Sequence, residues 1–319
     1  MTVPIVVRGH KPNGRLGNKI FQFALARKIA SDMRVDADLR GFQLDFVSGL
    51  CPFVPEDEYK NPLYLGVADC NVPSFSRLRE TYVDGKHDAI VLRGWGTRLE
   101  SLEQSKAVLQ NELNSLNLEF VEVDDESILI NLRLSEILRQ PPVHDDYTPL
   151  PVSYYQKVIR TPGKRPVFVG QMTASPYLDD LRSHFPDASF VDLAPMAAFE
   201  TIRRAHTKVI AMSTFSWLAA WLGSDNTKIF MPLAGAFNPA QRTDWNLTPW
   251  SDQRYTFNWV SPLKRHSQSL ETHLQDVETS SFSYPQVATT SKPLRMLQIR
   301  ALTQLGRVSN NLQRRGSGA

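Results

Sequence analysis

Short apolar runs alternate with amphipathic segments along most of the chain. An apolar run at 4–9 is followed by the turn "HKPNGRLGN" and then by apolar positions that approximate a 3.6-residue period from Ile20 to Met33. A second short strand is expected at 35–39. The chain therefore opens as strand, loop, helix and strand, which is the repeating unit of a parallel sheet.

The same alternation continues after an irregular stretch. Residues 45–80 are rich in Pro, Asp and Asn, lack a sustained period and are expected to form an insertion. The apolar run at 89–96 predicts a strand that ends in a glycine-flanked turn, and the spacing at 98–113 predicts a helix. The run "SILINLRL" at 127–134 predicts a further strand.

A second series of strands and helices begins at residue 166 and continues to residue 232. The Pro/Gly turn at 160–166 separates the two series, so the expected α/β fold has Rossmann-like domains at 1–160 and 161–262. Ligands of such folds bind at the carboxyl ends of the strands, which predicts a cleft between the two domains.

The pattern changes in the last part of the chain, at 263–319. A polar, Ser/Thr-rich segment there reads as a flexible linker, and a basic segment at 294–315 follows it. The basic segment aligns six apolar residues on one helical face: Leu294, Leu297, Ala301, Leu305, Val308 and Leu312. Three interpretations stay open for it: a helix lying on anionic lipid, a helix packed on the protein, or a disordered tail.

Composition excludes several classes of protein. The 319 residues include 36 basic and 33 acidic side chains, a net charge of +3 that is too balanced to indicate nucleic-acid binding. Cys51 and Cys70 are most simply two reduced thiols, although an oxidising compartment would allow them to pair. The apolar run at the start is too short for a signal peptide or a membrane span, so the expected location is the cytoplasm.

No spacing of His, Cys, Asp or Glu indicates a metal site. The acidic pair in "DAD" at 36–38 resembles the paired acids of known metal-binding motifs, but it falls within an expected strand, and we reject that interpretation.

Three stretches place polar residues at expected strand ends. In the opening turn, Gly14 and Gly17 permit close backbone approach, and a helix beginning near Asn18 would offer free N–H groups to an anion. Arg133, at the end of the strand 127–134, is suited to a two-pronged contact with phosphate. In "AMSTFSWLAAWLG", Ser213 or Thr214 follows a strand and begins a helix, a geometry that also binds diphosphates.

Each stretch also has a purely structural interpretation. The opening glycines fit neither the phosphate-loop pattern nor the dinucleotide fingerprint, so they can simply form a turn. Arg133 can form an interdomain salt bridge, and Ser213, Thr214 or Ser216 can cap the following helix. Trp217 and the Trp four residues later are most simply core packing.

The order of these stretches resembles the α-1,2-fucosyltransferase family, glycosyltransferase family 11, of which the chain would be a divergent member. "GRLGNKIFQFALARKIA" resembles the family's opening Gly-Gly-Leu-Gly-Asn-Gln-Met-Phe-Gln-Tyr-Ala motif, and "LRGWGTRLESL" resembles its Gly-Tyr-Trp-Gln segment. "INLRLSEI" falls where the family carries His-x-Arg-x-Gly-Asp. "YTPLPVSYYQKVI" and "AMSTFSWLAAWLG" are similar to two later family segments, and the five together cover most of 5–235.

The resemblance implies a GT-B-like enzyme that transfers L-fucose from GDP-β-L-fucose to an acceptor hydroxyl, with inversion and without a metal or other cofactor. Arg133 would hold the donor diphosphate. The N-terminal domain would be the acceptor side and the C-terminal domain would bind the nucleotide sugar. The nucleotide pocket would be lined by Ser213, Thr214, Phe215 and Ser216. The N-terminal wall of the cleft would be formed by Gly14, Arg15, Gly17, Asn18 and Lys19.

Other implied positions lie near the acceptor. Trp95 matches the family's Trp segment, and His144 and Asp146 lie in "PPVHDDY", a loop that could close over the cleft or be only a solvated turn. An inverting transfer needs a general base, for which Glu136 is a candidate by position, although it can equally be a solvated carboxylate.

The chain departs from the family at several motif positions. Asn131 replaces the motif histidine, Ser135 its glycine and Glu136 its acid, while Lys19 replaces a neutral glutamine. These departures allow a different nucleotide sugar, or a degenerate protein that binds a glycan or nucleotide without turnover. A dehydrogenase is disfavoured because its fingerprint glycines are missing.

The expected role is therefore in the synthesis of a surface polysaccharide or glycolipid, with a nucleotide-sugar donor and a glycan or lipid-linked glycan acceptor. The segment 294–315 would add a peripheral contact with the inner face of the membrane.

Overall fold

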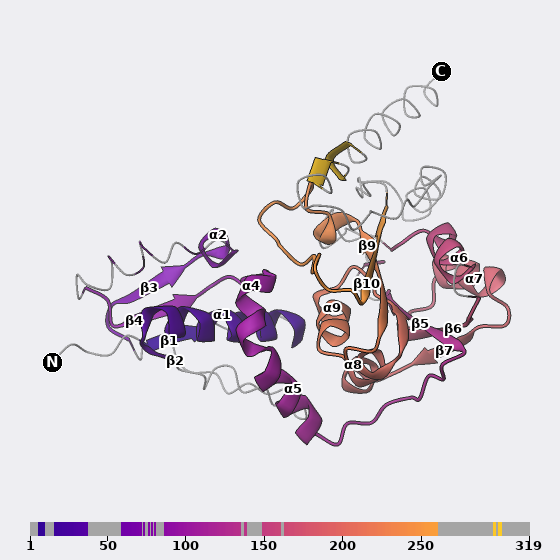
Figure 1. The fold of residues 1–319 in the computed structure, drawn as a ribbon, viewed down its shortest axis with the longest axis horizontal. Coiled ribbons are helices and arrows are strands. Elements are labelled where there is room, and N and C mark those ends of the chain that lie inside the picture. Colours follow the sequence, from indigo (N-terminus) through magenta and orange to yellow (C-terminus); the bar gives the residue numbers. More distant parts are fainter. Residues whose placement is uncertain are drawn as a thin grey trace. The chain divides into compact units, whose positions relative to one another are not determined.

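The computed structural model describes residues 6–9, 16–37, 59–71, 73, 76, 78, 80, 86–134, 137–138, 149–160, 163–260, 296–297 and 299–301. The chain forms two compact units. Unit 1 comprises 1–117 together with 244–247, and unit 2 comprises 118–243 and 248–319. Both units are α/β and both sheets are parallel throughout, as the alternating pattern predicts (Figure 1).

Unit 1 is built on a four-stranded sheet of order β2-β1-β4-β3. Its elements are β1 (Val6–Gly9), α1 (Leu16–Met33), β2 (Asp36–Ala37), β3 (Pro62–Leu65), α2 (Val67–Asn71), β4 (Ala89–Leu92), α4 (Leu99–Leu102), the 3-10 helix η3 (Glu103–Ser105) and α5 (Lys106–Ser115). The helix expected at 98–113 is present but is broken by the 3-10 turn.

Helix α1 provides most of the core of unit 1. The apolar positions that define its period are buried, but Phe21 and Leu25, which lie off that period, are fully buried as well. The helix is therefore covered on nearly all sides in its middle turns. Even the amide of Gln22 is inside, where its Nε2 donates to the carbonyls of Leu92 at 2.8 Å and Gly94 at 3.0 Å.

Unit 2 is built on a six-stranded sheet of order β10-β9-β8-β5-β6-β7. Its strands are β5 (Ser127–Arg133), β6 (Arg165–Gln171), β7 (Ser189–Asp192), β8 (Thr207–Val209), β9 (Lys228–Leu233) and β10 (Tyr255–Trp259). Its helices are α6 (Val152–Arg160), α7 (Pro176–His184), α8 (Pro195–Arg204), α9 (Thr214–Trp221) and the 3-10 helix η4 (Gly235–Phe237). Helices α6 and α7 cover one side of the sheet, and α8 and α9 cover the other (Figure 1).

The strand order of unit 2 reverses next to β5. The chain moves outward from β5 to β6 and β7, then returns to the other side of β5 with β8 and continues to β9 and β10. Numbered in chain order this is 3-2-1-4-5-6, the doubly wound order in which ligands bind outside the carboxyl ends of the first and fourth strands. In unit 2 those strands are β5 and β8.

The unit boundary differs from the one expected at about residue 160. The structure divides the chain after Asn117, because β5 pairs with β6 over seven residues and so belongs to the second sheet. Sequence periodicity identifies β5 as a strand but does not indicate which sheet it joins.

Local sequence explains where the helices of unit 2 begin. Ser175 caps α7 by accepting a hydrogen bond from the backbone N–H of Leu178 at 3.3 Å, and Pro176 follows at the first helical position. Helix α8 likewise begins with Pro195. On the face of the sheet covered by α6 and α7, Phe168 of β6 stacks on Phe190 of β7 with ring centroids 4.7 Å apart.

Candidate functional site

Two of the predicted site segments lie at the point where the strand order of unit 2 reverses. Strands β5 and β8 are direct neighbours, with Leu129 opposite Lys208 and Ile130 opposite Val209. Arg133 lies three residues beyond Ile130, and Ser213 lies four residues beyond Val209. Because the strands are parallel, both residues leave the sheet at its carboxyl edge, on either side of the strand reversal.

The start of α9 is held by two serine hydroxyls. Ser213 is 4% exposed, and its Oγ accepts a hydrogen bond from the backbone N–H of Phe215 at 3.2 Å. Ser216 is fully buried, and its Oγ donates to the carbonyl of Ala211 at 3.0 Å and to that of Ser213 at 3.2 Å. Ser213 is therefore the N-cap of α9, whereas Ser216 ties the first turn of the helix to the preceding backbone. The role of both hydroxyls toward a nucleotide stays a prediction.

The other predicted residues of this segment are half-buried. Thr214 begins α9, and Phe215 packs edge-on against Phe199 of α8 with ring centroids 5.3 Å apart. Trp217 and Trp221 are buried and stacked at 5.7 Å, as expected for core residues one turn apart. The first turn of α9 thus lies at the carboxyl edge of the sheet, and aromatic packing of Phe215 and Trp217 stabilises the helix.

The end of β5 is tightly packed against β6. Gly170 stands opposite Leu132 with φ of 143°, and a Cβ built there would lie 2.1 Å from the carbonyl oxygen of Leu132. Asn131, at the position of the family histidine, is 4% exposed, and its Nδ2 donates to the carbonyl of Val169 at 3.1 Å. Asn131 therefore joins the two strands, while Arg133, which is half-buried, is the last residue of β5 and stands opposite Gln171.

In unit 1 the corresponding edge is formed by the start of α1 and the residues after β4. Helix α1 begins at Leu16, so Gly17, Asn18 and Lys19 lie in its first turn and not in the preceding loop. Gly17 is buried, whereas Asn18 and Lys19 are half-buried. This helix starts about a turn earlier than the expected Ile20. Gly17, which the sequence pattern assigns to a turn, adopts helical geometry instead.

The segment after β4 is held from two sides. Gln22 of α1 donates to the carbonyl of Gly94, and a Cβ on Gly94 would lie 2.7 Å from Cys70 Cβ and 2.8 Å from Val67 Cα of α2. Trp95, the expected acceptor-side residue, is half-buried at this place. Sequence reasoning missed the role of Gln22, since a glutamine inside an amphipathic helix gives no signal of its own.

A second feature missed from the sequence is a four-residue strap, Asp244–Leu247, that packs on unit 1 although it follows β9 in the chain. The amide of Asn71 donates to Asp244 Oδ2 at 3.1 Å, and the Asn71 oxygen accepts from both the N–H and the hydroxyl of Thr97. The backbone N–H of Leu99 donates to the carbonyl of Asn246 at 2.7 Å.

The strap also contacts an ionised carboxylate of unit 1. Asn246 Nδ2 donates to Glu100 Oε1 at 2.6 Å. Burial raises the pKa of Glu100, but the hydrogen bonds from its own backbone and from Asn246, together with Arg98, outweigh that effect and hold the pKa below its usual range. Glu100 therefore stays ionised beside the strap.

Several predicted residues lie outside the described residues: Gly14, Arg15, Glu136, His144 and Asp146. Among the described residues, no group of three or more His, Cys, Asp or Glu side chains is arranged to hold a metal ion. In the same part of the chain, no helix is both long and apolar enough to cross a bilayer.

Cys70 is a free, buried thiol whose Sγ lies 3.5 Å from the carbonyl of Leu65. Burial raises its pKa to about 11, so the thiol is protonated and poorly nucleophilic at neutral pH.

Only residues 296–297 and 299–301 of the expected basic tail are described, and they are helical. Ile299 is fully buried, whereas Leu297 is 60% exposed. The expected apolar face contained Leu297 and not Ile299, so the buried side of this turn is not the predicted one.

No protein-family model and no curated protein matches the sequence. Among solved structures, the chain is similar to a mutant of Arabidopsis thaliana FUT1 in complex with GDP, at 13% identity and a TM-score of 0.44, over 72% of this chain and 70% of that one. It is also similar to a family 9 glycosyl transferase from Veillonella parvula, at 11% identity and a TM-score of 0.39, over 95% of this chain and 98% of that one. At these scores neither similarity bears on the donor, the acceptor or the chemistry.

Proposed function

We propose that the protein is an inverting, metal-independent glycosyltransferase that uses a nucleotide-diphosphate sugar, with GDP-fucose as the first candidate donor. One observation carries the proposal. Arg133 ends β5, and the first turn of α9 follows the adjacent parallel strand β8, at the reversal of strand order in unit 2. A doubly wound sheet binds nucleotides at this place. The α9 segment resembles a family motif, and of the earlier motif the chain keeps the arginine, Arg133.

The proposed donor site uses complementary charges in place of a metal ion. The guanidinium of Arg133 offers a planar fork to the diphosphate, and the backbone N–H groups at the start of α9 favour negative charge. When the bond between the anomeric carbon and the diphosphate oxygen breaks, its electron pair leaves with the nucleoside diphosphate. Arginine and helix N–H groups can stabilise that developing charge.

The acceptor hydroxyl attacks the anomeric carbon from the opposite face, so that its oxygen forms the new bond and its proton passes to a base. We assign Glu136 to that role by its position three residues beyond the strand that ends in Arg133. His144, Asp146, Trp95 and the start of α1 remain the proposed acceptor-side residues.

The assay that tests this proposal measures release of nucleoside diphosphate from GDP-, UDP-, CMP- and dTDP-linked sugars. Turnover of at least one donor that persists in EDTA and is lost in Arg133→Ala supports it. A strict requirement for Mg²⁺ or Mn²⁺ contradicts the metal-free mechanism. Tight nucleotide binding without turnover of any donor would instead favour a degenerate binding protein.

We also propose that 294–315 contacts anionic lipid in the full chain. The expected result is that a chain ending at Pro262 keeps its activity but loses binding to vesicles that contain phosphatidylglycerol. Undiminished vesicle binding after truncation rules out this segment as the anchor.

A further inference from the structure

Arg93 and Tyr64 form an exposed pair at the carboxyl edge of the unit 1 sheet. The guanidinium carbon of Arg93 lies 3.8 Å from the centroid of the Tyr64 ring. Arg93 is exposed, Tyr64 is 36% exposed, and the neighbouring Val67 is 55% exposed. A cation and two apolar surfaces are therefore presented together to solvent.

The strand register produces this pair. Tyr64 of β3 stands opposite Val91 of β4, and the backbone N–H of Arg93 continues the ladder by donating to the carbonyl of Leu65 at 2.8 Å. Side chains two residues apart on a strand point to the same face, so Arg93 projects on the same side as Val91 and reaches Tyr64 diagonally.

The backbone under Arg93 is fixed on both sides of the residue. The carbonyls of Leu92 and Gly94 both accept from Gln22 of α1, and Gly94 has no space for a side chain beneath α2. The position of Arg93 is thus set before any ligand arrives, which reduces the ordering cost of binding.

Within the part of the chain that the structure describes, Arg93 contacts an aromatic ring and no carboxylate. Among the described residues, its guanidinium makes no hydrogen bond or ion pair, and the nearby carboxylate of Asp69 instead accepts from the backbone N–H of Gly66 at 3.1 Å. Stacking on tyrosine covers one face of the guanidinium but leaves its N–H groups at the edge, where they match the oxygens of a carboxylate or phosphate.

We propose that Arg93 and Tyr64 recognise an anionic group on the sugar acceptor, a carboxylate or a phosphate, with Arg93 as the residue that selects for the charge. This inference rests on the proposed function for the identity of the ligand as an acceptor. A neutral glycan would leave the guanidinium without a partner, whereas an anionic sugar pairs with it while its C–H face packs on Tyr64 and Val67.

Binding of three probes to the full chain separates the possibilities: trigalacturonate for the carboxylate, mannose 6-phosphate for the phosphate, and maltotriose as the neutral control. We expect one anionic probe to bind more tightly than maltotriose. Arg93→Ala should weaken that binding roughly tenfold or more, as for the loss of hydrogen bonds to a charged group. Arg93→Lys should recover part of it, since it keeps the charge but not the fork.

Lys60→Ala provides the matched control, because Lys60 is another exposed cation of unit 1 and its replacement should leave binding unchanged. Equal affinity of wild type and Arg93→Ala for both anionic probes, or no binding of either probe, overturns the proposal. Nucleotide binding measured on the same variants distinguishes the two hypotheses, and Arg93→Ala should retain nucleotide binding. If the chain binds the anionic probe but no nucleotide sugar, the proposed function is contradicted and the anion site is not.

Discussion

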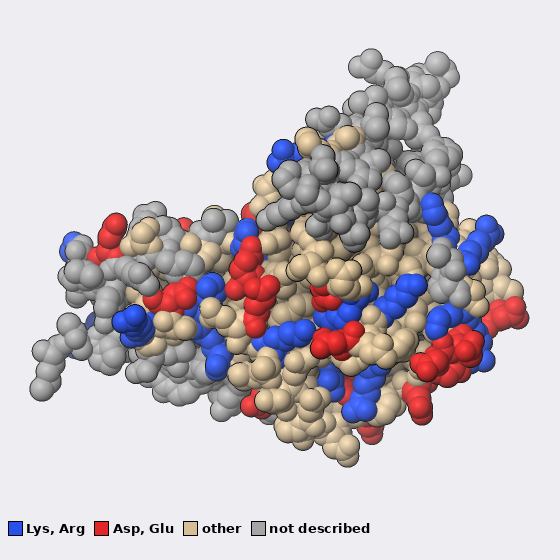
Figure 2. Space-filling view, viewed as in Figure 1, with Lys and Arg blue, Asp and Glu red and all other residues tan. Residues whose placement is uncertain are grey.

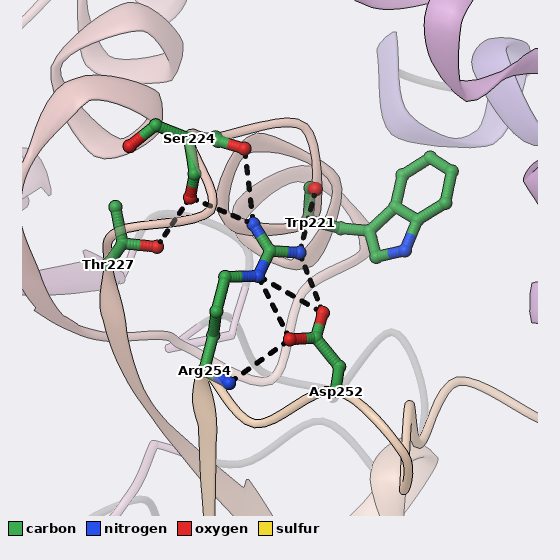
Figure 3. A network of polar contacts seen from close by, with 6 residues as sticks. Trp221, Ser224, Thr227, Asp252 and Arg254 are labelled. Carbon is green, nitrogen blue, oxygen red and sulfur yellow. Dashed lines mark hydrogen bonds and ion pairs between the residues drawn. The ribbon is translucent and has the colours of Figure 1, made fainter.

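Arg254, which is buried, and Asp252, which is half-buried, form an ion pair beside the end of helix α9. Arg254 Nη2 lies 2.7 Å from Asp252 Oδ2, and Nε of the same guanidinium lies 3.0 Å from Asp252 Oδ1 (Figure 3). The remaining N–H groups donate to the carbonyls of Trp221, Gly223 and Ser224 at 3.1–3.2 Å. One side chain at the start of β10 thus satisfies carbonyls that α9 leaves open at its C-terminus.

Replacing Arg254 by Met should destabilise unit 2 by roughly 1–3 kcal/mol, because it removes the cation paired with Asp252 and the side-chain donors to the carbonyls of Trp221 and Gly223. The free energy of unfolding in urea measures this cost. Arg165→Met is the control, since the pair of Arg165 with Asp124 is more than half exposed on both sides and is worth less than about 1 kcal/mol. Equal losses in the two variants would contradict the structural role of Arg254.

Stability should rise with pH above neutrality because of Lys208. This side chain is fully buried, donates to the carbonyl of Arg203 at 3.1 Å, and faces the cations of Arg254 and Arg203. Burial, and then these two charges, lower its pKa to about 7. Between pH 7 and the pKa of an unfolded lysine, the unfolded chain binds the extra proton, so raising the pH favours the folded state by about 1.4 kcal/mol per unit.

Lys208→Met should flatten this dependence and raise stability below pH 7, where the folded protein holds the buried charge. Denaturant midpoints at pH 6, 7, 8 and 9 are the measurement, with Lys228→Met as the exposed control. A wild-type midpoint that does not increase over this range would show that Lys208 is not titrating in the fold.

Gly170→Ala should distort the edge where Arg133 emerges. The added methyl group meets the carbonyl of Leu132, and the backbone there has a positive φ, so a cost above about 2 kcal/mol is expected. Gly163 also has a positive φ, but no atom lies within 4 Å of its Cβ position, so Gly163→Ala reports the backbone strain alone, about 1 kcal/mol. Calorimetric melting of both variants separates the steric effect from the conformational one.

Asn71→Ala should loosen unit 1 selectively. It removes the bonds to Asp244 and Thr97 that hold the strap, leaving buried donors unpaired at about 1–3 kcal/mol. Amide hydrogen exchange should increase in α1 and β4 but not in β5 and β6. Asn114→Ala, on an exposed turn of α5, should change neither region. Equal loss of protection in both sheets would contradict the assignment of the strap to unit 1.

Local patterns predicted the elements of this fold better than their assembly. The alternating strands and helices from β6 to β9 span Arg165–Leu233, within one residue of the series expected at 166–232, because caps, Pro and apolar runs act locally. The pairing of β5 with β6 and the docking of Asp244–Leu247 depend on contacts between distant residues, and the polar residues of the strap follow no period.

The candidate site shows the same limit. Sequence placed Arg133 and Ser213 at strand ends, and the structure brings those ends to neighbouring strands. The sequence alone could not reveal that the Ser216 hydroxyl and the Asn131 amide donate to backbone carbonyls. A hydroxyl or amide that binds the backbone is the same residue type as one that binds a ligand. Charge also gave little guidance, because Lys and Arg are interspersed with Asp and Glu on the face shown in Figure 2.

The most direct test of the central claim is a calorimetric titration of GDP-fucose and GDP into the full chain and into Arg133→Ala. We expect saturable binding that weakens roughly tenfold or more in the variant, as for a lost contact between arginine and a diphosphate. Arg165→Ala, a substitution on the exposed surface, should bind as the wild type does. Equal affinity in wild type and Arg133→Ala would contradict the assignment of the donor site to the edge between β5 and β8.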